Sequence, residues 1–270
     1  MLDWLRAMWQ QGIRTSGFPR DGVEFPERFR GRPVRDPAAC GDGCRPCSAR
    51  APSAFLTAAG RGPVALDVGA CLFSPEEAAA CPNGAIAYSR DHRLASSTRE
   101  GLVSPTGEVE LARALEERTR KLFGRSLRLR SVAAGSCNGC EAELVALGNV
   151  VFDLARFGIQ FVASPRHADG LVVTGAVSAN MRFALEQTYA AVPPPKIVIA
   201  VGACAINGGP FAGSPEVAGG VGDILPVDLW VPGCPPHPLT TLDGLLRLIG
   251  VIEGDERAAG VPAGATVGAR

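Results

Sequence analysis

Apolar residues follow two different patterns along this chain, and the change lies near residue 100. Residues 127–252 alternate short, continuous apolar runs with longer segments in which apolar residues recur at helical spacing. Short apolar runs are typical of strands buried on both faces, and the periodic segments of helices that cover them. The runs predict strands at residues 127–132, 159–162, 170–174, 196–201 and 228–231. This alternation predicts an α/β fold, a flavodoxin-like and mainly parallel sheet with helices on both faces.

The helical spacing predicts the segments that connect these strands. Helices are expected at residues 108–123, 141–157, 178–191 and 239–252, with Gly148 as an unusual residue inside the second. The domain limits follow: an N-terminal part at 1–100, a linker helix within 101–126 and the α/β domain at 127–255. The tail at 256–270 is rich in Ala and Gly and is expected to be poorly ordered.

The first hundred residues have another character. They are rich in Arg, Pro and Cys and poor in long periodic segments, which predicts a small α+β domain. The chain begins with an amphipathic segment that would form a helix lying on a membrane surface or packed on a partner subunit, and both hypotheses stay open. Its apolar and basic residues are Leu2, Trp4, Leu5, Met8, Trp9, Arg6 and Arg14.

Composition narrows the class of protein. Hydrophobic residues make up 46% of the chain, and the 27 basic residues balance the 27 acidic ones, so nothing favours a nucleic-acid partner. The start lacks the apolar region of a signal peptide, and no apolar run reaches the roughly 18 residues of a membrane span. A cytoplasmic location is therefore expected, where nine cysteines are more typical of metal ligands than of disulfides.

Four of these cysteines follow predicted strands. Cys137 and Cys140 come after the first strand, Cys204 after the fourth and Cys234 after the last. Because the carboxyl ends of parallel strands meet at one edge of a sheet, the fold should bring the four together. Four thiolates at one place are typical of an iron–sulfur cluster. A structural zinc site and, for the close pair alone, a thioredoxin-like redox pair are the alternatives.

A second group of cysteines lies in the N-terminal part. Its spacing resembles the repeat of a two-cluster bacterial ferredoxin, in which the fourth cysteine of each motif binds the other cluster. One cluster would then be bound by Cys40, Cys44, Cys47 and Cys81. The gap between Cys40 and Cys44 is one residue longer than usual. A degenerate ferredoxin fold without a cluster and a zinc site remain alternatives.

The other half of this ferredoxin pattern has lost most of its thiolates. The second cluster would need residues 51, 71, 74 and 77, where the chain has Ala51, Cys71, Ser74 and Glu77. The sequence therefore predicts one N-terminal 4Fe–4S cluster, and Cys71 is the cysteine left over.

The motifs of the second half, taken together and in order, carry a family resemblance. They are GSCNGCE at 135–141, SPRHADG at 164–170, TGAV at 174–177, GAC at 202–204, NGGPF at 207–211 and VPGCPP at 231–236. This combination resembles the small subunit of group 4 membrane-bound NiFe hydrogenases, the family of formate hydrogenlyase, which is homologous to the complex I subunit that carries the terminal cluster. Complex I subunits typically have two adjacent cysteines where this chain has Cys137-x-x-Cys140. The spacing therefore places the chain nearer the hydrogenase branch.

The resemblance implies a function. Cys137, Cys140, Cys204 and Cys234 would hold one 4Fe–4S cluster, proximal to the active site of a large catalytic subunit. Residues 13–19 and 26–33 resemble the lead-in of the ferredoxin-type subunit of the same complexes, so the chain looks like a fusion of two subunits. It would relay electrons without catalytic residues of its own, beside other iron–sulfur and membrane subunits, on the cytoplasmic face of the inner membrane.

Two other functions stay open. The large partner could lack nickel and reduce a quinone or another acceptor, as in complex I, and the relay would look the same. From another class, the chain could be a zinc-stabilised interaction module. An NAD or flavin site is not supported, because no Gly-x-Gly-x-x-Gly opens a helix after a strand. Glu141, Glu143 and His237 flank the C-terminal cysteines and are candidates for proton transfer or for contacts with the cluster.

Overall fold

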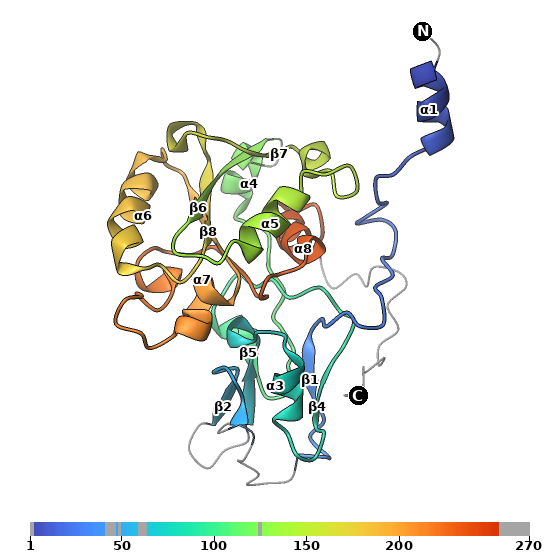
Figure 1. The fold of residues 1–270 in the computed structure, drawn as a ribbon. Helices are drawn as coiled ribbons and strands as arrows, with labels where there is room; N and C mark the ends of the chain where they lie inside the picture. Colours follow the sequence, from blue (N-terminus) through green and yellow to red (C-terminus); the bar gives the residue numbers. More distant parts are fainter. Residues whose placement is uncertain (1–2, 41–46, 48–49, 59–63, 124–125, 254–270) are drawn as a thin grey trace.

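The structure is a computed structural model, and it describes residues 3–40, 47, 50–58, 64–123 and 126–253. An α/β domain occupies the second half of the chain, and a smaller part with short antiparallel strands lies against one of its edges (Figure 1). No helix within these described ranges is long and apolar enough to cross a membrane.

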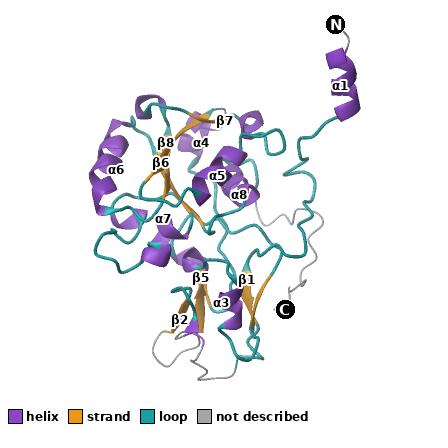
Figure 2. Ribbon diagram, viewed as in Figure 1, coloured by secondary structure: helices purple, strands orange, loops and turns teal. Residues whose placement is uncertain are grey.

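The sheet of the α/β domain has five parallel strands in the order β10-β9-β8-β6-β7. Counted along the chain within this domain, the order is 2-1-3-4-5, which is that of flavodoxin-like folds. The predicted fold class and all five predicted strands are confirmed (Figure 2). The strands are β6 (Leu127–Ala133), β7 (Ile159–Phe161), β8 (Gly170–Thr174), β9 (Ile197–Val201) and β10 (Leu229–Val231).

Helices cover both faces of this sheet. Along β9, Ile197 and Ile199 belong to an apolar cluster shared with α5 and α8, whereas Val198 and Ala200 belong to a second one shared with α6 and α7. A strand buried on both sides must be apolar throughout, which explains its continuous run. The helices are α4 (Glu117–Phe123), α5 (Gly139–Ala146), α6 (Ala179–Ala191), α7 (Ala203–Asn207) and α8 (Pro238–Leu248).

Two predicted helices are much shorter than expected, and the one predicted at 239–252 runs from Pro238 to Leu248. The helix predicted at 108–123 begins only at Glu117. Upstream of it the chain is extended: the N–H of Ala112 donates to the carbonyl of Ala95 at 2.8 Å, and that of Leu115 to the carbonyl of Leu248 at 2.9 Å. Pairing with distant segments replaced the helical hydrogen bonds that the apolar spacing suggested.

The helix predicted at 141–157 also differs from the structure. Helix α5 begins at Gly139, so Cys140 is in its first turn rather than before it, and it ends at Ala146. The chain then turns near Gly148, whose N–H donates to the carbonyl of Val145 at 3.0 Å. The remainder forms a short 3-10 helix.

The N-terminal part contains two small antiparallel sheets, β1–β4 and β2–β3–β5. It has its own apolar cluster, which contains Cys47, Cys71 and Cys81. Its elements are α1 (Asp3–Gln11), β1 (Pro33–Arg35), β2 (Leu56–Ala58), β3 (Val64–Asp67), α3 (Pro75–Ala79), β4 (Ile86–Tyr88) and β5 (Val103–Ser104). The 3-10 helices of the chain are η1 (Val68–Ala70), η2 (Glu100–Leu102), η3 (Leu154–Phe157), η4 (Pro165–His167), η5 (Gly209–Phe211) and η6 (Val221–Asp223).

Helix α1 projects away from the rest of the chain (Figure 1). It has no buried residue, and Trp4, Met8 and Trp9 are exposed. Leu2, which the sequence analysis placed on the same apolar face, lies outside the described residues. Both hypotheses for this helix, a membrane surface or a partner subunit, stay open.

Candidate metal centre

The four C-terminal cysteines lie where three strands end. Cys137 is in the loop after β6, and Cys140 follows in the first turn of α5. Cys204 is in the first turn of α7, directly after β9, and Cys234 is in the loop after β10. The carboxyl edge of the sheet therefore brings them to one region, as the strand pattern predicted.

The charges of these thiols act on one another. Burial raises the pKa of the Cys140 thiol to about 12, and the Glu141 carboxylate and the other three cysteines raise it as well. Burial also raises the pKa of Cys204 to about 11, with added effects of Cys234 and Cys137. For Cys234 the causes are burial, then Cys137, then Glu77 of the N-terminal part. The four thiols are thus electrostatic neighbours.

This arrangement suits a metal cluster. Thiols that raise each other's pKa cannot all ionise unless a positive centre compensates their charge, and metal binding supplies it. Among the described residues, no three His, Cys, Asp or Glu side chains are close enough together to bind one metal ion. A four-iron cluster takes each thiolate at a separate iron, so its ligands stand farther apart than those of a single zinc ion.

Glycine backbone packs closely against two of the sulfurs. Gly202 has a φ of +92°, and a Cβ added there would lie 2.5 Å from Sγ of Cys140. A Cβ on Gly209 would lie 2.8 Å from Sγ of Cys204. Any other residue at either position would occupy space next to one of these cysteine sulfurs, so the packing requires glycine there.

The acidic residues beside the cysteines have different surroundings. The hydroxyl of Thr174, at the end of β8, donates to Oε1 of Glu141, while Oε2 of Glu141 is buried without a hydrogen-bond partner. Partial burial raises the pKa of Glu143. The sequence indicated both acids and placed Thr174 in the TGAV motif, but it could not show that the Thr174 hydroxyl contacts Glu141, because the two residues are far apart in the sequence.

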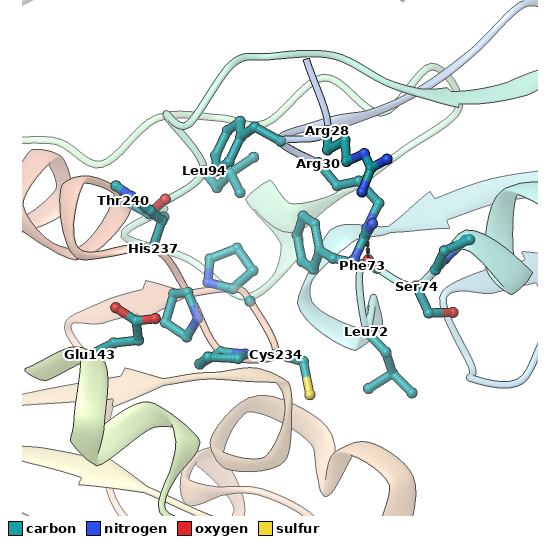
Figure 3. A pocket seen from close by; sticks show the side chains of 16 residues that line it. Arg28, Arg30, Leu72, Phe73, Ser74, Leu94, Glu143, Cys234, His237 and Thr240 are labelled. Atoms are coloured by element: carbon teal, nitrogen blue, oxygen red, sulfur yellow. Dashed lines mark hydrogen bonds between the residues drawn. The ribbon is translucent and has the colours of Figure 1, made fainter. Parts of the chain in front are cut away.

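A cavity of about 390 Å³ lies beside Cys234, between the α/β domain and the N-terminal part. Figure 3 shows Glu143, His237 and Cys234 on one side of it and Phe73 and Ser74 on the other. Nδ1 of His237 accepts the N–H of Leu239 at 3.2 Å, and its ring packs edge-on against aromatic rings. His237 therefore caps the N-terminus of α8, and its ring packs against these aromatic rings.

The N-terminal cysteines are gathered by a different part of the fold. Cys47 and Cys81 are buried in the apolar cluster of this part, and Cys40 packs against it. The N–H of Ala85 donates to Sγ of Cys81 at 3.3 Å. Cys44, the fourth expected ligand, lies outside the described residues.

Comparison with known proteins gives the family. Residues 137–248 match the family model described as NADH ubiquinone oxidoreductase, 20 Kd subunit. A Pyrococcus furiosus protein named "Probable membrane-bound hydrogenase subunit mbhJ" is 43% identical over 139 residues, which are 50% of this chain and 83% of that protein. The chain belongs to the 20 kDa subunit family. The resemblance deduced from its motifs is confirmed.

Other members of the 20 kDa subunit family align over part of their length. Formate hydrogenlyase subunit 7 of Escherichia coli is 41% identical over 160 residues, 59% of this chain and 63% of that protein. An NADH-quinone oxidoreductase subunit of Heliobacterium modesticaldum is 47% identical over 110 residues, 40% of this chain and 63% of that protein. The chain thus spans less than two thirds of these two relatives.

The family match covers the C-terminal cysteines but not the N-terminal ones. Members of the 20 kDa subunit family typically bind a 4Fe–4S cluster, and the matched residues include Cys137, Cys140, Cys204 and Cys234. Cys40, Cys47 and Cys81 precede the matched residues, so the N-terminal cluster remains a prediction from the sequence.

Proposed function

We propose that this chain is the iron–sulfur electron-transfer subunit of a membrane-associated, group 4 NiFe hydrogenase-type complex similar to formate hydrogenlyase. It would relay electrons to or from an active site in a large partner subunit. The observation that carries this proposal is the meeting of four thiols, from the ends of three strands, at one edge of the sheet. A cluster bound there supplies one-electron redox chemistry.

The chain's own residues would hold this cluster and control its surroundings. Cys137, Cys140, Cys204 and Cys234 are the proposed ligands. Cys140 and Cys204 are partly buried, whereas Cys137 and Cys234 are exposed. The exposed ligands suit a face that a large subunit covers, because an electron must pass between the two chains over a short distance and water must be kept from the cluster.

A second cluster in the N-terminal part would extend the relay. Its proposed ligands are Cys40, Cys44, Cys47 and Cys81. The support is the ferredoxin-type spacing, the packing of Cys40, Cys47 and Cys81 at one apolar cluster, and the backbone N–H that donates to Cys81. The chain would then combine an electron-input domain with the domain that faces the active site.

The hydrogenase branch is favoured over a quinone-reducing one by two observations. The Cys137-x-x-Cys140 spacing departs from the adjacent cysteines typical of complex I subunits. The two hydrogenase-type relatives also align over 160 and 139 residues, against 128 for an NADH-quinone oxidoreductase subunit of Bacteroides thetaiotaomicron and 110 for the Heliobacterium protein. That protein is the reason to keep the second candidate: the same relay in a nickel-free complex that reduces a quinone.

The first test is the metal content of the anaerobically purified chain, with EPR spectra after dithionite reduction. About eight iron and eight sulfide per chain, with two interacting reduced clusters, are expected if both sites are filled. About four of each would leave the C-terminal relay in place and contradict the N-terminal cluster. Zinc without sulfide would overturn the electron-transfer function and support the interaction module.

The second test separates the two branches. The complex is purified from its native source, and its nickel content and hydrogen-dependent reduction of viologen dyes are measured. Nickel with hydrogen oxidation is expected. A nickel-free complex that reduces quinones instead would support the second candidate.

A further inference from the structure

The half of the ferredoxin-type pattern that lacks its cysteines contains a buried carboxylate instead, that of Glu77. Residues 71, 74 and 77, where a second cluster would need ligands, come together in the structure. Cys71 and Glu77 are both completely buried. Sγ of Cys71 donates to Oε2 of Glu77 at 3.2 Å, and the N–H of Ser74 donates to the same oxygen at 3.1 Å. A hydrogen-bond network occupies the place of the missing thiolates.

The hydrogen bonds of this network suit an ionised Glu77 carboxylate. Every contact of its carboxylate is with a donor, and two of the donors are backbone N–H groups, which cannot accept. No ion pair among the described residues involves Glu77. The charge is therefore held in the interior by neutral dipoles, where solvent and salt screen it weakly. The donors are the Cys71 thiol, the Leu72 and Ser74 N–H groups, and the Tyr88 and Ser53 hydroxyls.

Glu77 lies behind the surface that meets the C-terminal ligands. Helix η1, directly before Cys71, packs on α7, which carries Cys204: a Cβ added to Gly69 would lie 2.9 Å from Cγ2 of Ile206. Residues 72–75 line the same cavity as Cys234 (Figure 3). The lost cluster position thus faces the proposed C-terminal cluster.

We propose that Glu77 is a positioning residue that sets the midpoint potential of the C-terminal cluster. The inference rests on the proposed function, because it needs that cluster to be present. Reduction adds one electron from the donor and makes no bond. The fixed carboxylate of Glu77 opposes the added negative charge and lowers the potential. In support, the charge of Glu77 already reaches Cys234, where it raises the pKa of the thiol after burial and Cys137.

The test is an EPR-monitored redox titration of the full chain in its complex, with Glu77→Gln against wild type. In a medium of effective dielectric constant about 20, a unit charge at a distance on the order of 10 Å changes any one-electron equilibrium roughly tenfold, which sets the scale of the expected effect. The variant should therefore be reduced more easily by about that factor, which is about 59 mV for one electron. Glu76→Gln is the matched control, since it removes the same charge from an exposed position of the same helix. In Glu76→Gln the midpoint potential of the C-terminal cluster should hardly change.

A second variant separates charge from structure. Glu77→Asp keeps a carboxylate at this position, so the potential should stay close to that of wild type. A purely structural role would shift both variants in the same direction. The proposal is overturned if Glu77→Gln keeps its clusters with the wild-type potential, or if Glu77→Asp raises the potential as much as is expected for the loss of the charge. The second criterion holds even if Glu77→Gln loses iron. A wild-type chain without a C-terminal cluster would instead overturn the proposed function.

Discussion

The carboxyl edge of the parallel sheet and the N-terminal part both gather cysteines, but different structural features hold them. At the sheet edge, Cys204 and Cys234 follow strands that are paired along their length, so the topology alone brings distant residues together. In the N-terminal part, Cys40, Cys47 and Cys81 are held by loops and short elements around a small apolar cluster.

This difference predicts that the two regions will tolerate substitutions differently. A ligand held only by loops and short elements can be replaced while the surrounding fold persists, and the ferredoxin-type spacing would place second-cluster ligands at positions 71, 74 and 77, where the structure has a hydrogen-bonded network. Cys204, directly after the inner strand β9, has less freedom, because the strand that places it also forms the core. The sheet-edge site is therefore expected to be the indispensable one.

The largest effect is expected from Cys204→Ser. The variant should lose the C-terminal cluster, and with it about half of the iron and sulfide and all relay activity, while the EPR signal of the N-terminal cluster remains. Cys71→Ser is the control, because Cys71 belongs to neither ligand set and serine keeps a donor for Glu77. Relay activity retained in Cys204→Ser would contradict the proposed path.

Cys81→Ser tests the other region. It should reduce the iron content from about eight to about four per chain and remove only the N-terminal signal, because Cys81 is the proposed ligand that the second ferredoxin-type motif would contribute to the first cluster. Iron analysis and EPR on the anaerobic protein measure this. An unchanged iron content would mean that the N-terminal cysteines hold no cluster. The two regions would then differ in that only the sheet-edge cysteines bind one.

The sequence predicted the sheet-edge region well, for a physical reason. Strands buried on both faces are continuous apolar runs, so β8 and β9 could be recognised without the structure, and their parallel order fixed the edge at which the cysteines meet. The helix prediction at 108–123 was wrong over its first half because the backbone of Ala112 and Leu115 is hydrogen-bonded to Ala95 and Leu248, which are far away in the sequence.

The Glu77 network could not be predicted, because its members are far apart in the sequence. Ser53 and Tyr88 approach Glu77 only after the N-terminal strands have paired, and no spacing rule joins them. The ferredoxin-type spacing placed Glu77 where a cysteine would be expected, but the burial of its side chain and the cavity that residues 72–75 share with Cys234 required the structure.

An intermediate effect is expected from Gly202→Ala. The added Cβ would meet Sγ of Cys140 at 2.5 Å, in a backbone conformation that disfavours side chains. The free energy of unfolding should fall by about 1–3 kcal/mol, and the iron content of the C-terminal site should fall with it. Gly213→Ala separates the two causes, since Gly213 also has a positive φ, of +82°, but no atom lies within 4 Å of its added Cβ. Equal iron loss in both variants would show that the sulfur contact is unimportant.

The smallest effect concerns the junction between the two regions. His92 is 1% exposed, neither ring nitrogen has a hydrogen-bond partner, and its ring packs against Phe18 and Phe25. Phe25 in turn contacts His237, three residues after Cys234. Burial lowers the pKa of His92 from 6.5 to about 4; Asp91 opposes this, and the positive charges of Arg93, His237 and Arg247 add to it. Folding therefore requires the neutral ring.

Between pH 6.5 and 4 the unfolded chain binds a proton at His92 that the folded chain does not, so stability falls as the pH is lowered through this window. The difference between these two pKa values of His92 corresponds to at most roughly 3 kcal/mol of the free energy of unfolding. His92→Phe should make the decline of the thermal midpoint shallower, and the remaining slope should include His237, whose pKa burial also lowers. If the thermal midpoint falls with pH equally in wild type and in His92→Phe, then the buried His92 at this junction does not contribute to the acid sensitivity of the protein.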